Sequence, residues 1–138
     1  MTISMTIESR HDELDRITAA VEELGESNGW TPELTYKINL VLEELTLNIM
    51  NYGYVDDKVH LIDVSVVSDD SQITIEIVDD GRPFNPVLDA PSPDLEGPIM
   101  ERRVGGWGIH IVRSVMDDVR YVRADDKNRM TLVANLAH

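Results

Sequence analysis

One long helical stripe constrains the fold of this 138-residue chain more than any other feature. Thr31 and Pro32 are typical of a helix start, because a threonine side chain caps free amides and proline at the first helical position has no amide to leave unpaired. Apolar residues then recur at helical spacing over about five turns: Leu34, Ile38, Val41, Leu42, Leu45 and Ile49. The pattern predicts a helix from Pro32 that ends at Gly53, and its apolar face has to be covered by another layer.

The rest of the chain supplies that layer. Residues 2–7 alternate polar and apolar side chains with a period of two, as a half-buried strand does. Periodicity and turn residues predict the other elements: a helix over 11–25, strands over 59–67 and 73–78 around a turn at 68–71, a helix from Gly108 to about Asp117, and strands over about 119–124 and 129–136 around a turn at 125–128. This order favours an α+β fold, a two-layer sandwich with the helices on one face of a mixed, mostly antiparallel sheet.

The charge and the absence of cysteine narrow the function. Twelve Lys and Arg against 26 Asp and Glu leave a formal net charge of −14, which repels nucleic-acid phosphates and anionic lipid headgroups. We therefore expect neither a nucleic acid nor a membrane as a partner. The chain has no cysteine and no apolar run of about 18 residues, so we expect a cytoplasmic protein. Its length fits one domain over 1–138.

One long stretch, 83–106, shows no periodicity. It combines acidic residues and glycines with five prolines, at positions 83, 86, 91, 93 and 98. A structureless connection of more than about 20 residues is uncommon inside a compact domain and is usually a functional lid or a disordered segment. We expect a lid.

Glu44 and Asn48 lie four residues apart on the predicted long helix, so they share one face of it. The simplest interpretation is a polar face in contact with water. However, Asn is a poor helix former, and a carboxylate with an amide oxygen one turn away also suits a magnesium ion or an oriented water. Both interpretations stay open on these two residues alone.

Asp79, Asp80 and Gly81 directly follow the strand predicted over 73–78, at the start of the lid. Asp-Gly is a common turn dipeptide, so an ordinary turn explains this segment when it is taken alone.

At the other end of the lid, Gly105, Gly106 and Gly108 lead straight into a predicted helix. A glycine-rich loop before a helix presents unpaired amides and the positive end of the helix dipole, which together bind phosphate groups. A flexible hinge would have the same composition, so this segment alone does not decide between the two.

Taken in order, these segments resemble the ATP-binding boxes of a known superfamily. The stretches are VLEELTLNIMNYGY at 41–54, DDGRPFNP at 79–86 and GGWGIHIVRSVMDDVRY at 105–121. They are similar to boxes of the Bergerat-fold (GHKL, histidine-kinase-like) ATPases, the superfamily of gyrase, histidine kinases and MutL, and in particular to those of anti-sigma factor serine/threonine kinases. Three boxes in this order, over nearly the whole chain, are far more specific than any one of them.

The resemblance implies that the chain binds ATP and Mg²⁺. It implies that Glu44 is the general base, that Asn48 is the magnesium ligand, and that Asp79 accepts a hydrogen bond from the adenine amino group. It also implies that Gly81 lets the base lie close to the backbone and that the glycine loop before the last helix holds the phosphates. The implied nucleotide-binding positions are Asn48, Asp79, Gly81, Gly105, Gly106, Gly108 and Ile109.

Three further residues have no assigned role. Arg102 and Arg103 in the lid are candidates for charges near the γ-phosphate, and equally for arginines in contact with solvent only. Thr131 is the one candidate for the late Gly-Thr element of the superfamily, and its uncertain register keeps it out of the predicted site.

Three functions are compatible with such a site. The preferred one is an ATP-dependent serine/threonine protein kinase that acts as an anti-sigma-type switch: it binds a sigma factor or a similar regulator and phosphorylates a serine on a small antagonist protein. The alternative is a non-catalytic ATP-binding module that sequesters a regulatory partner. The third, a detached ATPase half of a histidine kinase, has only His11 and Asp12 in its favour. Members of the family often dimerise, so a homodimer is also an expectation.

Overall fold

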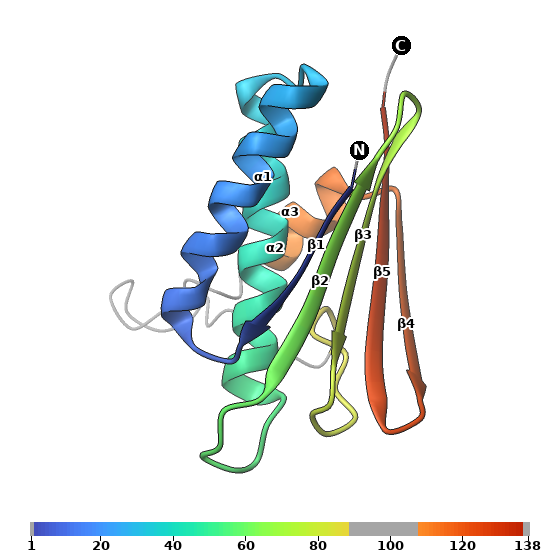
Figure 1. Ribbon diagram of the computed structural model, residues 1–138. Helices are drawn as coiled ribbons and strands as arrows, with labels where there is room; N and C mark the ends of the chain where they lie inside the picture. The colour runs from blue at the N-terminus through green and yellow to red at the C-terminus, as the bar shows by residue number, and fades with distance from the viewer. Residues whose placement is uncertain (1, 89–107, 137–138) are drawn as a thin grey trace, which may run out of the picture.

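The computed structural model describes residues 2–88 and 108–136. Within them, helices pack in one layer against one face of an open sheet (Figure 1). The elements in chain order are β1 (Thr2–Glu8), a 3-10 turn η1 (His11–Glu13), α1 (Leu14–Asn28), α2 (Pro32–Tyr52), β2 (Leu61–Ser68), β3 (Gln72–Asp79), α3 (Gly108–Val115), β4 (Asp118–Ala124) and β5 (Lys127–Asn135). The predicted α+β sandwich is confirmed.

The sheet has the strand order β1-β2-β3-β5-β4. All four strand pairings among the described residues are antiparallel, so the mixed sheet that we predicted is antiparallel throughout this part of the chain. The pairing of β3 with β5 matters for the site, because its register places Asp79 directly opposite Asn128.

The core lies between the helical layer and the sheet, where the two apolar patterns meet. In β3, Ile73, Ile75 and Ile77 point to the helices and are fully buried, as expected for alternate residues of a strand with one covered face. The stripe of α2 meets them and is also buried, from Ile38 to Ile49. The main stripe of predicted core residues is therefore confirmed.

The start of α2 is as predicted, and the end of α1 is not. The Thr31 Oγ1 accepts a hydrogen bond from the Leu34 amide at 3.1 Å, which caps α2. We placed the end of the first helix at Gly25, but Gly25 lies inside α1, buried where a Cβ would meet the Thr35 Oγ1 at 2.5 Å. The helix ends at Gly29, which adopts the left-handed conformation with φ = 69°.

The turn between β4 and β5 is shorter than predicted. Asp125 and Asp126 both have positive φ, 55° and 60°, as in a two-residue hairpin turn of type I′. Strand β5 consequently begins at Lys127, and Asn128 belongs to the sheet, not to the turn where we had placed it.

No helix within residues 2–88 and 108–136 combines the length and the apolar character needed to cross a bilayer.

Candidate functional site

Asp79 is the last residue of β3, on the face of the sheet that the helices cover. Its side chain is only 3% exposed, although Asp is rarely buried without partners. The register places it between Ile62 of β2 and Asn128 of β5. The carboxylate predicted to bind adenine therefore lies at the end of a central strand, held between two neighbouring strands.

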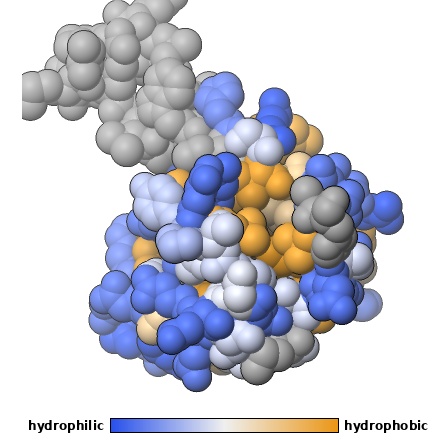
Figure 2. Space-filling view, turned by 90° about the horizontal axis from the view of Figure 1, so that it is seen from above, coloured by the Kyte–Doolittle hydropathy of each residue, from blue (hydrophilic) through white to orange (hydrophobic). Residues whose placement is uncertain are grey.

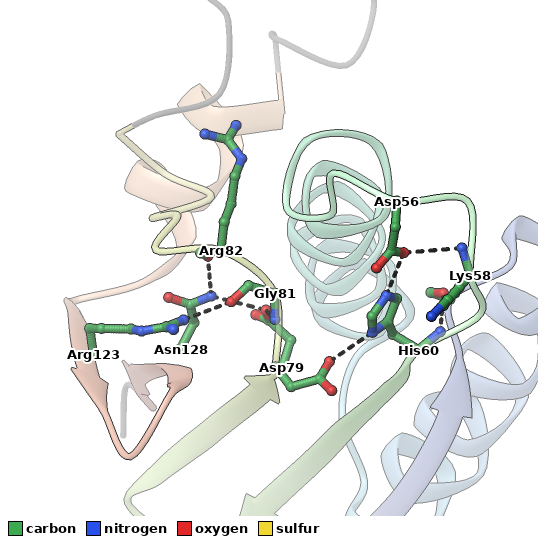
Figure 3. Close-up of polar contacts among 10 residues, drawn as sticks. Asp56, Lys58, His60, Asp79, Gly81, Arg82, Arg123 and Asn128 are labelled. Atoms are coloured by element: carbon green, nitrogen blue, oxygen red, sulfur yellow. Dashed lines mark hydrogen bonds and ion pairs between the residues drawn. The ribbon is translucent and has the colours of Figure 1, made fainter.

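Both recorded hydrogen bonds to the Asp79 carboxylate go to Oδ1, from the Gly81 amide at 2.9 Å and from the Asn128 Nδ2 at 3.0 Å. Burial raises the pKa of Asp79 and the neighbouring Asp80 adds to this, while the two hydrogen bonds and Arg123 act in the opposite direction. Figure 3 shows Asn128 and Arg123 reaching from β5 and β4 toward the segment that follows β3.

Gly81 lies against the C-terminal end of α2. A Cβ at this position would come within 2.4 Å of the Gly53 carbonyl oxygen and 3.0 Å of the Asp79 Oδ1. The Arg82 amide donates to the same Gly53 oxygen at 2.9 Å, and the Arg123 Nη1 donates to the Gly81 oxygen at 2.7 Å. Within the described residues, the close approach that requires a glycine here is to the backbone of Gly53, the residue that follows α2.

Glu44 and Asn48 are both buried on α2, at 8% and 3% exposed. The interpretation of a polar face in contact with water is therefore wrong. The Asn48 Nδ2 donates to the Glu44 Oε1 at 3.3 Å and to the Pro86 carbonyl oxygen at 3.1 Å. Both bonds recorded for Asn48 in the described residues use its nitrogen, so its amide oxygen is the atom that fits a magnesium ion, which prefers oxygen ligands.

The segment after Gly81 connects these two groups. The Phe84 amide donates to the Asn128 Oδ1 at 3.3 Å and to the Tyr121 hydroxyl at 3.2 Å, and the Phe84 ring is 1% exposed. Two residues later, the Pro86 oxygen meets Asn48. The first residues of the predicted lid are thus attached to β5 on one side and to α2 on the other.

The glycine loop falls mostly outside the described residues. This holds for Gly105 and Gly106, and for Arg102 and Arg103 of the predicted lid. Gly108 is the first residue of α3, and Ile109 follows it in the helix, although its side chain is not described. The helix α3 packs on α2 and buries Val112.

Thr131 lies in β5 beside two core residues, Met130 and Leu132, and its side chain is on the opposite face of the sheet. It pairs with Glu76 and Arg120 across the sheet. Thr131, which we kept out of the predicted site, therefore lies on the face of β5 opposite to that of Asn128.

The sequence analysis missed Asn128 and Tyr121. Asn128 is 1% exposed, and the Tyr121 hydroxyl donates to its Oδ1. A signal for Asn128 existed: the buried positions Met130, Leu132 and Ala134 alternate, and the same period extends back to residue 128. The polar identity of Asn128, next to two aspartates, pointed instead to a turn.

A second polar cluster lies beside the first, between the loop after α2 and the end of β3. The His60 Nε2 lies 2.7 Å from the Asp56 Oδ1, and its Nδ1 lies 3.2 Å from the Asp80 Oδ1. The Tyr54 ring stacks on the imidazole with 4.1 Å between centroids. The hydrogen bond to Asp56 raises the pKa of His60. Figure 3 shows His60 and Asp56 in this loop.

Two hollows lie away from Asp79 and Asn48. One of about 640 Å³ lies between α1 and α2, and one of about 600 Å³ lies at the end of the molecule that carries the α1–α2 connection and the β2–β3 turn. Seen from above, this end shows an apolar hollow with a polar rim (Figure 2). Neither hollow is lined by Glu44, Asn48 or Asp79. In the part of the chain that the structure describes, no three His, Asp or Glu side chains converge as a metal site.

Comparison with known proteins decides the family. Residues 7–134 match the model of the histidine kinase-like ATPase domain. The chain belongs to this family. Among curated relatives, this ATPase domain is 24% identical over 117 residues to the serine/threonine-protein kinase BtrW of Bordetella bronchiseptica, covering 85% of this chain and 82% of the relative. It is 27% identical over 120 residues to the anti-sigma F factor of Geobacillus stearothermophilus, covering 86% and 80%.

Membership in the histidine kinase-like ATPase family supports ATP binding by this chain.

Proposed function

We propose that this protein is an ATP-dependent serine/threonine protein kinase that acts as an anti-sigma-type regulatory switch in the cytoplasm. It binds a sigma factor or a similar regulator and phosphorylates a serine on a small antagonist protein. The observation that carries the proposal is the buried Glu44–Asn48 pair, which is attached through Pro86 to the same segment that Asp79 begins. The names of the two relatives, a serine/threonine kinase and an anti-sigma factor, support it.

Asp79 is proposed to accept a hydrogen bond from the adenine amino group. Its Oδ1 already accepts from Gly81 and Asn128, which leaves Oδ2 for the nucleobase. Gly81 keeps the turn close to α2 so that this carboxylate stays in place. Gly105, Gly106 and Gly108, with Ile109, are proposed to hold the phosphates at the start of α3 through backbone amides.

Asn48 is proposed as the protein ligand of Mg²⁺, through the amide oxygen that its two hydrogen bonds leave available. When bound, the ion neutralises phosphate charge and helps to orient the γ-phosphoryl group.

Glu44 is proposed as the general base. Its carboxylate accepts the proton of the acceptor serine hydroxyl, the serine oxygen bonds to the γ-phosphorus, and the bond to the oxygen bridging the β-phosphate breaks to release ADP. Phosphoryl transfer depends mainly on positioning and charge, and the hydrogen bond from Asn48 holds the Glu44 carboxylate at a fixed place on α2.

The test is phosphate transfer from labelled ATP, with Mg²⁺, to a small antagonist protein that this chain binds. We expect Glu44→Gln to lower transfer about a hundredfold or more while ATP affinity changes little. Glu43→Gln is the matched control, because Glu43 is the neighbouring residue on α2 and is exposed. The product should be acid-stable phosphoserine; acid-labile phosphohistidine would instead support the histidine-kinase interpretation.

A non-catalytic ATP-binding module is the second candidate. It is favoured by the burial of Glu44 and its bond to Asn48, since a buried, bonded carboxylate also serves a purely structural role. In that case the wild type binds ATP and the partner without transfer, and Glu44→Gln changes neither. A homodimer is a further proposal for both candidates, tested by sedimentation.

A further inference from the structure

The Asn128 side chain makes four hydrogen bonds within the described residues, three of them to the segment 79–84 and one to Tyr121 of β4. Its Nδ2 donates to the Asp79 Oδ1 at 3.0 Å and to the Arg82 carbonyl oxygen at 2.7 Å. Its Oδ1 accepts from the Phe84 amide at 3.3 Å and from the Tyr121 hydroxyl. A side chain that is 1% exposed is thus satisfied at both ends.

These partners fix which way the amide points. The nitrogen faces two groups that only accept, a carboxylate and a carbonyl, and the oxygen faces a backbone amide and a hydroxyl. A flipped amide would place oxygen against oxygen on one side and donors against each other on the other. The orientation of Asn128 is therefore set by its surroundings.

The Asp79 carboxylate has little freedom as a result. Asn128 of β5 and the amide of Gly81 in the turn after β3 bind the same oxygen, so rotation of the carboxylate breaks at least one hydrogen bond to a buried carboxylate. Arg123, whose charge lowers the pKa of Asp79, donates a hydrogen bond to the Gly81 carbonyl oxygen. Asn128 is the one side chain in the described residues that donates to the Asp79 carboxylate.

We infer that Asn128 is the positioning residue that aims the free oxygen of Asp79 at the nucleobase, and that it thereby sets the preference for a 6-amino over a 6-oxo purine nucleotide. The inference rests on the proposed function, in which Asp79 meets the amino group. A fixed Oδ2 accepts from the 6-amino group of ATP, whereas the 6-oxo group of ITP places an acceptor against it. If the carboxylate turns freely, it can accept from the N1–H of ITP instead, and the preference for ATP over ITP becomes smaller.

The experiment is calorimetric titration of ATP and ITP into the whole chain, with wild type and Asn128→Ala compared. We expect the wild type to bind ATP more tightly than ITP. We expect Asn128→Ala to lower the ATP affinity about tenfold and the ITP affinity by less, so that the ratio of ATP affinity to ITP affinity falls at least threefold. Arg129→Ala is the matched control, because Arg129 is the next residue of β5 and its side chain is 55% exposed on the other face. Arg129→Ala should show the same ratio of ATP affinity to ITP affinity as the wild type.

Two further variants keep the test decisive if Asn128→Ala does not fold. Tyr121→Phe removes the hydroxyl that donates to Asn128, and it should lower the ratio of ATP affinity to ITP affinity by a smaller factor than Asn128→Ala does. Asn128→Asp keeps the shape but places a carboxylate against that of Asp79, with Asp80 and Arg123 as the other charged groups nearby. The two acids then share a proton, so ATP affinity should fall as the pH rises from about 6 to 8, while the wild type changes little.

Two results would overturn the inference. One is an equal loss of ATP and ITP affinity in Asn128→Ala, since a merely structural role moves both alike. The other is a wild-type ratio of ATP to ITP affinity in folded Tyr121→Phe together with an ATP affinity of folded Asn128→Asp that does not fall as the pH rises. If the folded wild type binds neither nucleotide, the proposed function fails, and this outcome is distinct from both.

Discussion

At the scale of single residues, burial makes the charge of Asp79 costly. A carboxylate whose pKa is raised in the folded protein contributes stability that is fully present below its ordinary value of 3.8 and is lost as the pH rises through the raised value. Relative to Asp79→Asn, the wild type should therefore lose free energy of unfolding as the pH rises through this range. Urea titrations of both proteins at a series of pH values measure the difference, and a difference that is constant or grows with pH would contradict the assignment.

The same residue shows why a site can be only partly predicted. Asp79 could be found because Asp-x-Gly after an apolar strand is a recognisable pattern within the three boxes. Asn128 could not be found in this way, because its role comes from the register of β3 with β5 over 49 residues of sequence separation. We had expected a turn over 125–128, but the turn has two residues, Asp125 and Asp126, and it leaves Asn128 in β5.

At the scale of elements, His60 joins the loop after α2 to the end of β3. Its pKa is raised, chiefly by Asp56 and further by Asp80. A base whose pKa is raised on folding contributes stability that is fully present below its ordinary value of 6.5 and is lost as the pH rises through the raised value. The wild type should therefore lose stability relative to His60→Gln as the pH rises past this range.

Thermal unfolding of both proteins between about pH 5 and 9 measures this effect. Asp56→Asn is the second arm, because it removes the largest cause of the shift; in that background the His60→Gln substitution should change the pH dependence much less. Equal pH profiles for the wild type and His60→Gln would show that His60 does not titrate differently in the folded state.

The helices show which boundaries local chemistry determines. Thr31 and Pro32 identified the start of α2 because a cap acts within its own turn. The end of α1 was wrongly predicted at Gly25, because this glycine lies inside the helix and allows the close approach of Thr35. The terminal glycine is Gly29, which differs from Gly25 in its positive φ.

At the scale of the whole molecule, the layers followed from periodicity, because burial of one face of each strand and helix is what folds the chain. The β1-β2-β3-β5-β4 order did not follow from it, since alternation does not say which strands are neighbours. The stretch over 83–106 has no periodicity to interpret, and of it only residues 83–88 are described. Their attachments to Asn128 and Asn48 depend on contacts between distant segments.

The central claim is that distant segments together bind one adenine nucleotide, and calorimetric titration with ATP, with and without Mg²⁺, tests it most directly. The account predicts saturable binding by the folded wild type, tighter with Mg²⁺, and at least a tenfold loss of affinity in Asp79→Asn, which replaces the free acceptor oxygen. Correctly folded wild-type protein that takes up no ATP, or an Asp79→Asn variant that binds ATP as tightly as the wild type, would contradict it.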